Sequence, residues 1–271
     1  MLDASRRWRR GGRSIGLVPT MGALHAGHMR LVQSARAEND VVVASVFVNP
    51  TQFGPNEDFD RYPRDWDRDL KLLEEAQVDA VYRPSVEMMY PADASTRVHV
   101  GGLSDTLEGA ARPGHFDGVA TVVTKLFAAV EPDRAYFGQK DAQQVAVVQR
   151  LVRDLDLGVD IRAVPTVREP DGLALSSRNV YLSGEERRAA ASISAALREA
   201  AAAYASGERD LVRLRALLAA RLALEPLVRP EYAELVQPAT FQKPGTLAVI
   251  AARIGKTRLI DNHDLAKPFP G

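Results

Sequence analysis

Two histidines spaced three residues apart, His25 and His28, stand in the segment PTMGALHAGH, which follows a short apolar stretch. Side chains with this spacing project to the same side at the start of a helix. The glycines at positions 22 and 27 allow backbone to approach a ligand closely. The first turn of a helix also supplies unpaired N–H groups and a partial positive charge. The segment therefore predicts a phosphate site with two imidazole donors, which would stabilise the charge that grows during phosphoryl transfer.

The same segment also fits a pair of ordinary loop histidines or half of a zinc site. Zinc is disfavoured because the chain has no cysteine, and because His99, His115 and His263 show no ligand spacing. The segment is neither the Gly-x-Gly-x-x-Gly dinucleotide fingerprint nor a P-loop. Its His-x-Gly-His motif is similar to that of the adenylyl-transferring superfamily, which includes class I aminoacyl-tRNA synthetases and small nucleotidyltransferases.

That superfamily carries a second phosphate-binding motif late in the chain, and the candidate here is LSSRN at residues 175–179. Two hydroxyls and an arginine in a polar loop can bind the β- and γ-phosphates of a nucleotide. The planar fork of Arg178 matches phosphate oxygens. By itself the segment also fits a surface turn with an N-cap serine, and its pairing with the histidine motif favours the phosphate role.

Between these motifs lies YFGQKDAQQ at residues 136–144, at a predicted strand-to-helix junction. In a parallel α/β sheet such junctions lie at the carboxyl edge of the strands, where ligands bind. Lys140, one of only 6 lysines against 29 arginines, can neutralise an α-phosphate. Asp141 suits either the cap of the following helix or a magnesium-bound water. Gln144, one helical turn later, can face the same site.

A fourth segment, FVNPTQFG, lies at the carboxyl end of the apolar strand that is predicted at residues 41–48. Asn49 and Gln52 are neutral hydrogen-bonding groups beside an aromatic residue, and they suit a small polar substrate with hydroxyls and methyls. Residues 55–64 form a polar, turn-rich segment that is a candidate lid over a reactive intermediate. The alternative is a long connection, although loops of this length are more often functional.

The elements that must position these residues alternate between strand and helix patterns through the first two-thirds of the chain. The predicted strands are 14–18, 41–48, 80–82, 134–137 and 160–164, and the predicted helices are 29–38, 65–76, 116–130 and 142–155. Residues 98–107 remain ambiguous. The run VVVASVFV suits a strand buried on both faces. This alternation predicts a parallel α/β sheet with helices on both faces.

The remaining third has a different pattern. Helices are predicted at 183–205, with Ser183 and Glu186 in a capping-box arrangement, and at 210–225. Strands are predicted at 232–236 and 247–254, without a further βαβ repeat. We therefore expect a nucleotide-binding domain at residues 1–166 and a smaller α+β domain at residues 167–271. No Gly/Ser-rich linker separates them, so we expect the two domains to pack closely against each other.

Composition excludes several classes of protein. The 35 basic residues balance the 35 acidic ones, and aromatic residues make up 6 %, so a nucleic-acid partner is not expected. The absence of cysteine excludes disulfides and thiolate chemistry and favours the cytoplasm. No apolar run is long enough to span a bilayer, so no membrane partner is expected. The basic start MLDASRRWRRGGR lacks the apolar core of a secretory signal, and we expect a solvated turn there, with a transit peptide as the alternative.

The four motifs, in this order, resemble the pantothenate synthetase family over residues 15–182. The resemblance includes FVNPTQFGPNEDFDRYPR, RPGHFDGVATVVTKLF and PDRAYFGQKDAQQ, and the later TRLIDN resembles the family's C-terminal strand. It implies a Rossmann-like first domain that binds ATP and pantoate, and a lid-like second domain. It also implies that the pantoate carboxylate attacks the α-phosphate of ATP in the presence of Mg²⁺. The resulting pantoyl adenylate then reacts with β-alanine and releases AMP.

The resemblance further implies roles for individual residues. The ATP contacts would be Met21, Gly22, Ala23, Leu24, His25, Ala26, Gly27, His28, Gly138, Gln139, Lys140, Asp141, Val167, Leu175, Ser176, Ser177 and Arg178. His25, His28, Lys140 and Arg178 would be catalytic, with His28 as the acid. Gln52 and Gln144 would hold pantoate, and the enzyme would be a cytoplasmic homodimer. The residues themselves place Asn49 with Gln52 as a substrate contact.

The chain departs from the family pattern at three places. Gln139 stands where an acidic residue is frequent, and Gln237 where aspartate is common. Only the basic segment precedes the first predicted strand, where the family usually has a short strand and a helix.

Two rival functions make different demands on the residues. An adenylyltransferase for a phosphorylated substrate would need a cationic pocket, which the neutral residues 49–52 argue against. A catalytically silent nucleotide-binding module would be expected to lack His28, Lys140 or Arg178, and all three are present.

Overall fold

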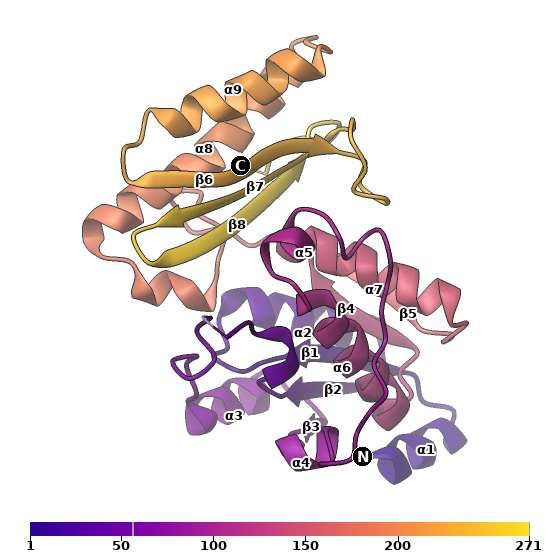
Figure 1. Ribbon diagram of the computed structural model, residues 1–271. Helices are drawn as coiled ribbons and strands as arrows, with labels where there is room; N and C mark the ends of the chain where they lie inside the picture. The colour runs from indigo at the N-terminus through magenta and orange to yellow at the C-terminus, as the bar shows by residue number, and fades with distance from the viewer. Residues whose placement is uncertain (56, 271) are drawn as a thin grey trace. The chain divides into compact units, whose positions relative to one another are not determined.

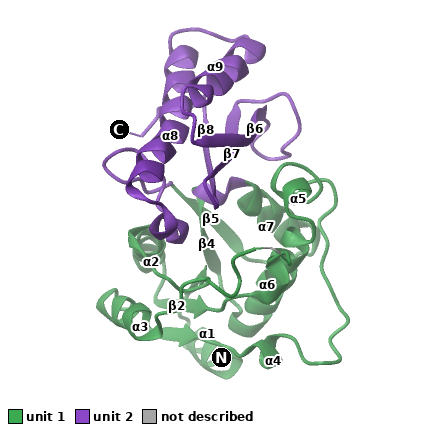
Figure 2. Ribbon diagram, turned by 60° about the vertical axis from the view of Figure 1, so that its left-hand side comes forward, with its two compact units in different colours: residues 1–139, 143–165 green, residues 140–142, 166–271 purple. Residues whose placement is uncertain are grey.

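The computed structural model describes residues 1–55 and 57–270, and the chain forms two compact units (Figures 1 and 2). The first unit comprises residues 1–139 and 143–165, and the second comprises residues 140–142 and 166–271. The main division thus falls one residue before the boundary expected from the sequence, and a short stretch after the fourth strand joins the second unit.

The first unit is built on a five-stranded parallel sheet in the order β3-β2-β1-β4-β5. The strands are β1 (Ile15–Thr20), β2 (Val41–Val46), β3 (Ala80–Tyr82), β4 (Arg134–Gly138) and β5 (Asp160–Val164). Ile15, Leu17 and Val41 are fully buried, because helices cover both faces of a parallel sheet. The chain moves outward from β1 to β3 on one side and from β4 to β5 on the other. The carboxyl ends of β1 and β4 therefore form a topological switch point, where open α/β sheets bind ligands.

Helices α2 and α3 lie on one face of this sheet, and α6 and α7 lie on the other (Figure 2). The helices of the unit are α1 (Leu2–Arg10), α2 (Ala26–Glu38), α3 (Trp66–Glu75), α4 (Val86–Met89), α5 (Glu108–Ala111), α6 (His115–Val130) and α7 (Ala142–Asp154), with 3-10 turns η1 (Pro50–Gln52) and η2 (Gln139–Asp141). The predicted parallel α/β architecture is confirmed. Strand β2 ends two residues earlier than predicted, because the chain turns there towards η1. The ambiguous stretch 98–107 contains neither helix nor strand.

The solvated turn predicted at the N-terminus is wrong, because residues 2–10 form helix α1. Ser5 in this helix is fully buried. Arg6 pairs with Glu131 at 3.3 Å, and Arg9 pairs with Asp133 at 2.9 Å. The helix is thus fixed by polar contacts with residues more than 120 positions away, which the periodicity of apolar residues does not reveal.

The second unit packs two helices against a three-stranded antiparallel sheet, which confirms the predicted α+β arrangement. Its elements are η3 (Ser177–Tyr181), α8 (Gly184–Ala205), α9 (Leu211–Ala223), β6 (Val228–Val236), β7 (Leu247–Ile254) and β8 (Thr257–Asp264), with strand order β6-β7-β8. Alternate residues of β7, such as Ile250 and Ile254, join Ile193 and Leu197 of α8 in one core. The predicted capping box opens α8.

Strand β6 begins four residues earlier than predicted. The pairing with β7 shifts register between Pro230 and Tyr232. Proline cannot donate to a sheet and is confined to edges and bulges, so its presence obscured the first part of this edge strand.

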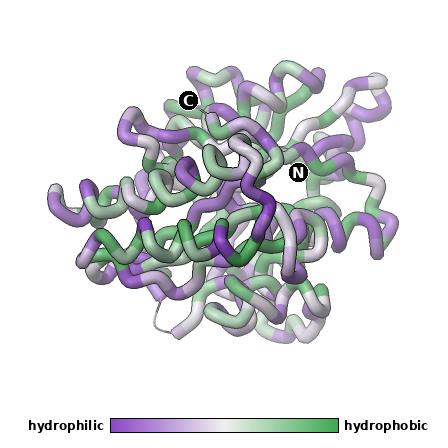
Figure 3. The backbone as a smooth tube through the Cα atoms, turned by 90° about the horizontal axis from the view of Figure 1, so that it is seen from above, coloured by the Kyte–Doolittle hydropathy of each residue, from purple (hydrophilic) through white to green (hydrophobic). Residues whose placement is uncertain are grey.

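None of the helices within the described part of the chain is both long enough and apolar enough to cross a lipid bilayer. Figure 3 shows hydrophilic and hydrophobic positions interleaved along the helices.

Candidate active site

His25 and His28 form the start of α2. His25 is the N-cap, and its Nδ1 accepts the Gly27 N–H at 3.1 Å. His28 Nδ1 accepts the His25 N–H at 3.3 Å, which completes a reciprocal capping box. The ring centroids lie 4.1 Å apart, as the spacing predicts for side chains on one side of the helix. Because each Nδ1 accepts a hydrogen bond, the proton of each neutral ring resides on Nε2, and both rings carry an Nε2–H donor.

The turn before these histidines has an unusual backbone that one buried carboxylate supports. Gly22 and Ala23 have φ values of 80° and 51°, in the left-handed region. Asp69, on α3 and only 2 % exposed, accepts the N–H groups of Ala23 and Leu24, both at 2.8 Å. A Cβ at position 22 would lie 2.9 Å from Asp69 Oδ2, so glycine is required there. Sequence reasoning missed Asp69, since its partners lie 45 and 46 residues earlier in the chain.

Asn49 and Gln52 lie where β2 ends, beside the end of β1, because Thr20 pairs with Val46 in the sheet. Gln52 Nε2 lies 3.0 Å from the sulfur of Met21, so two predicted site residues meet here. Asn49 is 1 % exposed, and its Nδ2 donates to Gln52 Oε1 and to the Gly118 carbonyl, both at 3.1 Å. Asn49 thus orients the Gln52 amide from within the protein.

The segment after η1 folds back on itself through aromatic contacts. The ring of Phe53 lies 5.3 Å from that of Phe59 and 5.9 Å from that of Tyr62, measured between centroids. Tyr62 is 5 % exposed, and Arg64 donates to the Phe59 carbonyl at 2.8 Å. Of the predicted lid at residues 55–64, residue 56 lies outside the described residues.

Gly138 ends β4, which neighbours β1 on the side opposite to β2. A Cβ at position 138 would meet no other atom within 4 Å, so the glycine leaves open space at this strand end. Gln139 begins the 3-10 turn η2, and Gln144 is half-buried in the first turn of α7. The first unit therefore brings Met21 through His28, Asn49, Gln52, Gly138, Gln139 and Gln144 to the carboxyl edge of its sheet.

The second unit contains the other predicted residues. Lys140 Nζ lies 3.5 Å from Asp141 Oδ1, and the Lys140 side chain is 19 % exposed. The Lys140 carbonyl accepts the side-chain amide of Asn262, on β8, at 2.8 Å. The TRLIDN segment therefore holds the backbone of a predicted phosphate-binding lysine.

Strand β8 also positions the loop that contains LSSRN. The Val167 carbonyl accepts the Leu175 N–H at 2.9 Å, so the segment between them forms a closed loop. Arg168 in this loop forms a bidentate ion pair with Asp261 of β8, at 2.6 and 3.0 Å, and the two side chains are 9 % and 2 % exposed. Ser176 caps η3 by accepting the Arg178 N–H at 3.2 Å, with Ser177 as the first residue of the turn.

Sequence reasoning gave no individual role to Arg168, Asp261 or Asn262. The signals that point to them are the long motifs TVREPDG and TRLIDN, in which they lie.

Known proteins show the same combination of sequence and fold. The family model described as pantoate-beta-alanine ligase matches residues 1–264. A pantothenate synthetase of Herpetosiphon aurantiacus is 55 % identical over 267 residues, covering 96 % of this chain and 97 % of that protein. A pantothenate synthetase of Acidobacterium capsulatum is 60 % identical over 257 residues, covering 93 % of this chain and 86 % of that protein.

Solved structures of pantothenate synthetases share the fold of this chain. The crystal structure of pantothenate synthetase from Thermus thermophilus superimposes with a TM-score of 0.91 at 49 % identity, covering 96 % of this chain and 97 % of that one. The pantoate-beta-alanine ligase of Francisella tularensis, crystallised with an ATP compound and β-alanine, has a TM-score of 0.80 at 36 % identity, covering 98 % of this chain and 97 % of that one. Because these matches span almost the whole chain, the protein belongs to the pantoate–β-alanine ligase family of enzymes.

Proposed function

We propose that this chain condenses (R)-pantoate with β-alanine at the expense of ATP. A pantoate carboxylate oxygen attacks the α-phosphorus, the bond to the β-phosphate oxygen breaks, and pyrophosphate leaves. The amine of β-alanine then attacks the acyl carbon of pantoyl adenylate. The acyl C–O bond breaks, AMP leaves, and the nitrogen loses a proton as the amide forms. Activation of the carboxylate thus divides one difficult substitution into two easier ones.

The observation that carries this proposal is the reciprocal capping of His25 and His28. Both rings have their Nδ1 engaged with backbone, so each is held as an Nε2–H donor at the carboxyl edge of the sheet. Such preorganised donors need not reorganise when charge grows on the phosphates. The N–H groups and dipole of α2 add to the attraction for an anion. We assign ATP binding to residues 21–28, with both histidines as catalytic donors and His28 as the acid.

For the second unit we propose phosphate contacts. Lys140 supplies a compact positive charge to the α-phosphate, and Arg178 supplies a bidentate fork to the β- and γ-phosphates. Ser176, Ser177 and Leu175 lie in the same loop, and Val167 offers backbone. Gly138 to Asp141 complete the proposed ATP contacts. The lid-like role of the second unit and of residues 55–64 belongs to the same proposal.

Pantoate, on this proposal, is held by the side-chain amides of Gln52 and Gln144. The Gln52 amide contacts Met21, which also offers an apolar surface for the methyl groups of pantoate. Asn49 acts indirectly, because its own polar atoms bond to Gln52, Gly118, Thr51 and Tyr90.

We propose that Mg²⁺ binds at the ATP phosphates with only one or two ligands from the protein. Among the residues that the structure describes, no three His, Cys, Asp or Glu side chains converge as a metal site. Nucleotide-bound Mg²⁺ typically takes one or two carboxylates together with substrate phosphates and water. Asp141, 45 % exposed, is the carboxylate we assign to this role. When bound, the ion would neutralise phosphate charge. We also propose a cytoplasmic homodimer, on the basis of membership in the family.

The test is AMP release from ATP and Mg²⁺ with pantoate and β-alanine supplied together, singly or not at all. We expect AMP and pyrophosphate in full turnover only with both substrates. A folded protein that binds ATP but forms no AMP with both substrates would refute the proposed reaction and indicate a different acceptor.

Variants test the assignment of the site. His28→Ala and Lys140→Ala should each slow AMP formation by about 100-fold or more. His25→Asn should keep the N-cap, because asparagine is a preferred N-cap residue, while its short side chain lacks the Nε2–H donor. Matched controls are His99→Ala and Lys71→Ala, whose side chains are 57 % and 77 % exposed. Near-normal turnover in His28→Ala and Lys140→Ala would overturn the assignment.

A further inference from the structure

The segment RPGHFDG, at residues 112–118, has no role in the reaction as proposed above. It links α5 to α6, with Arg112 directly after α5 and His115 as the first residue of α6. The His115 side chain is buried, although histidine is usually only partly buried in proteins. A buried polar side chain of this kind must have hydrogen-bond partners, and those partners identify its role.

Two polar side chains of this segment, those of Arg112 and His115, bond to the same backbone atom, the carbonyl oxygen of Gln52. His115 Nδ1 lies 2.9 Å from that oxygen, and Arg112 Nη2 donates to it at 3.2 Å. Arg112 Nη1 also lies 3.1 Å from His115 Nε2. Because a guanidinium can only donate, His115 Nε2 is the acceptor and Nδ1 carries the proton that is donated to Gln52. The two side chains therefore act as one unit.

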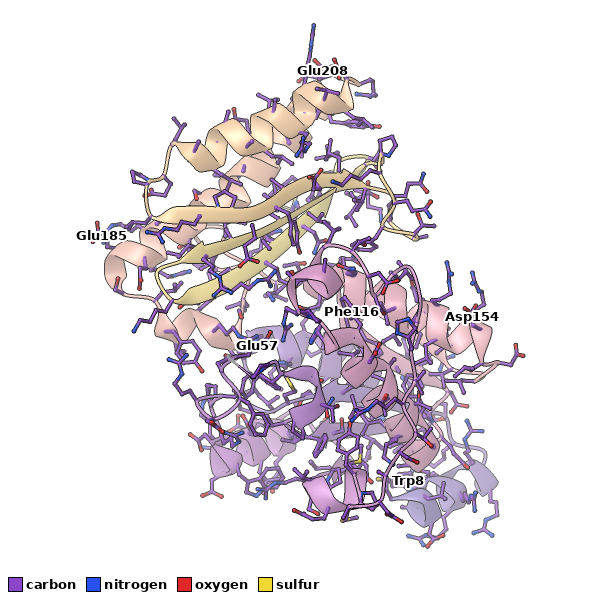
Figure 4. The ribbon with its side chains drawn as sticks, viewed as in Figure 1. Trp8, Glu57, Phe116, Asp154, Glu185 and Glu208 are labelled. Atoms are coloured by element: carbon purple, nitrogen blue, oxygen red, sulfur yellow. The ribbon has the colours of Figure 1, made fainter. Side chains whose placement is uncertain are left out.

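A carboxylate that follows η1 in the chain fixes the Arg112 side chain. Arg112 Nε and Nη2 donate to the two oxygens of Glu57 at 2.7 and 2.6 Å, in a bidentate pair whose side chains are 16 % and 25 % exposed. Figure 4 labels Glu57 and also Phe116, the neighbour of His115 in α6. Glu57 follows Gln52 by five residues, so the same cluster contacts the chain at the last residue of η1 and again five residues later.

The glycine that ends the motif permits this approach. A Cβ at Gly118 would lie 2.4 Å from the Thr51 carbonyl oxygen and 2.7 Å from the Gln52 nitrogen. Helix α6 thus contacts η1 backbone to backbone, and any larger residue would push the turn away. The Gly118 carbonyl in turn accepts the Asn49 amide, which orients the Gln52 side chain.

The charge state of His115 suits this arrangement. Burial, assisted by the neighbouring Arg112 cation, lowers the pKa of His115 to about 4, against the raising effects of Gln52, Glu108 and Glu57. The ring is therefore neutral at physiological pH and keeps Nε2 as an acceptor for Arg112.

We propose that Arg112 and His115 are positioning residues for pantoate, which fix the Gln52 backbone so that its side-chain amide meets the substrate in one orientation. This inference rests on the proposed function, in which Gln52 holds pantoate. A glutamine side chain has three rotatable bonds, so its amide is ordered only if its backbone and its side-chain partners are ordered too. Small displacements of a positioning group are costly to an enzyme that relies on orientation.

The experiment compares steady-state constants of wild type, His115→Ala, His115→Asn and Arg112→Lys, with pantoate and ATP varied separately. His115→Ala should raise KM for pantoate by about 10- to 100-fold while KM for ATP changes less than about twofold. His115→Asn places an amide N–H near the position of Nδ1 and should recover most of that loss. Arg112→Lys keeps the charge but loses the bidentate fork, and we expect an intermediate rise in KM for pantoate.

His99→Ala is the matched control, because His99 pairs with Asp117 of the same motif yet its side chain is 57 % exposed. It should leave both KM values unchanged. Thermal unfolding of each variant reports whether it folds, and His115→Asn and Arg112→Lys remain informative if His115→Ala does not.

The inference is overturned if KM for pantoate stays within twofold of wild type in folded variants, if both KM values rise together, or if His115→Asn is as impaired as His115→Ala. Wild-type protein that releases no AMP with both substrates would instead refute the proposed function itself. The two failures are therefore distinguishable within one experiment.

Discussion

Replacement of Asp69 by asparagine tests how the turn before the histidines is held. The carboxylate accepts the N–H groups of Ala23 and Leu24, one on each oxygen. Asparagine has nearly the same shape but only one acceptor oxygen, so its NH₂ group must face one of the two backbone donors. The substitution therefore removes one bond and leaves a buried N–H opposite another donor, without creating a cavity.

The expected loss of unfolding free energy in Asp69→Asn follows from these two hydrogen bonds. A hydrogen bond to a charged acceptor contributes about 1.5–3 kcal/mol, and a buried donor left unsatisfied costs about 1–3 kcal/mol. Relief from burying a charge offsets part of this loss, since Asp69 is 2 % exposed. We therefore expect the free energy of unfolding of the first unit to fall by about 2–4 kcal/mol. That change corresponds to a decrease in Tm of roughly 4–16 °C.

Urea and thermal unfolding, together with the KM for ATP, measure the effect. The turn leads directly into the His25 cap, so we expect KM for ATP to rise along with the loss of stability. The matched control is Asp67→Asn in the same helical turn, where the side chain is exposed and the change should stay within about 0.5 kcal/mol. Equal stability and equal KM for ATP in Asp69→Asn and Asp67→Asn would refute the view that the carboxylate holds the turn.

Two further predictions concern buried polar groups. Asp261→Ala leaves the Arg168 guanidinium, 9 % exposed at its side chain, without its bidentate partner. We therefore expect the free energy of unfolding of the second unit, measured by urea titration, to fall by about 3–5 kcal/mol. A loss below about 1 kcal/mol would contradict this prediction. The pKa of His115 is lowered to about 4, so between about pH 6.5 and 4 the unfolded chain binds more protons than the folded one. This contribution to stability is present above about pH 6.5 and should be lost as the pH falls through 4, by roughly 3 kcal/mol in total. Urea midpoints measured across this range should fall less steeply in His115→Asn than in wild type, and parallel curves would contradict the prediction.

Local patterns in the sequence specified most of the elements and the order in which they occur. The bounds of β3, β5 and β7 agree with the predicted strands, and those of α2, α3, α6 and α7 differ from the predicted helices by one to three residues. Apolar periodicity and capping residues lie within one turn or a few residues of the structure that they determine. The same holds for His25 and His28, whose contact is set by their spacing within the start of one helix.

The predicted site residues lie in four motifs, each of which follows the end of a strand or opens a turn. The common location of PTMGALHAGH, FVNPTQFG and Gly138 at the carboxyl edge of the first unit's sheet followed from the parallel pattern, whereas Lys140, Asp141 and the LSSRN motif lie in the second unit. Helix α1 was not predicted, because the acidic residues that bind its arginines lie more than 120 residues away in the sequence.

The sequence by itself thus determined the parallel α/β sheet, the smaller α+β unit and the chemistry-bearing motifs. Only the tertiary structure decided which residues hold those motifs in place. Asp69 supports the turn before the histidines although it lies 45 residues from Leu24 in the sequence. Arg112 and the Gln52 carbonyl that it contacts are 60 residues apart. Asp261 and Arg168 are 93 residues apart. The physical reason is that a buried donor or acceptor must be satisfied by whatever group the fold brings beside it, and that group has no fixed spacing along the chain.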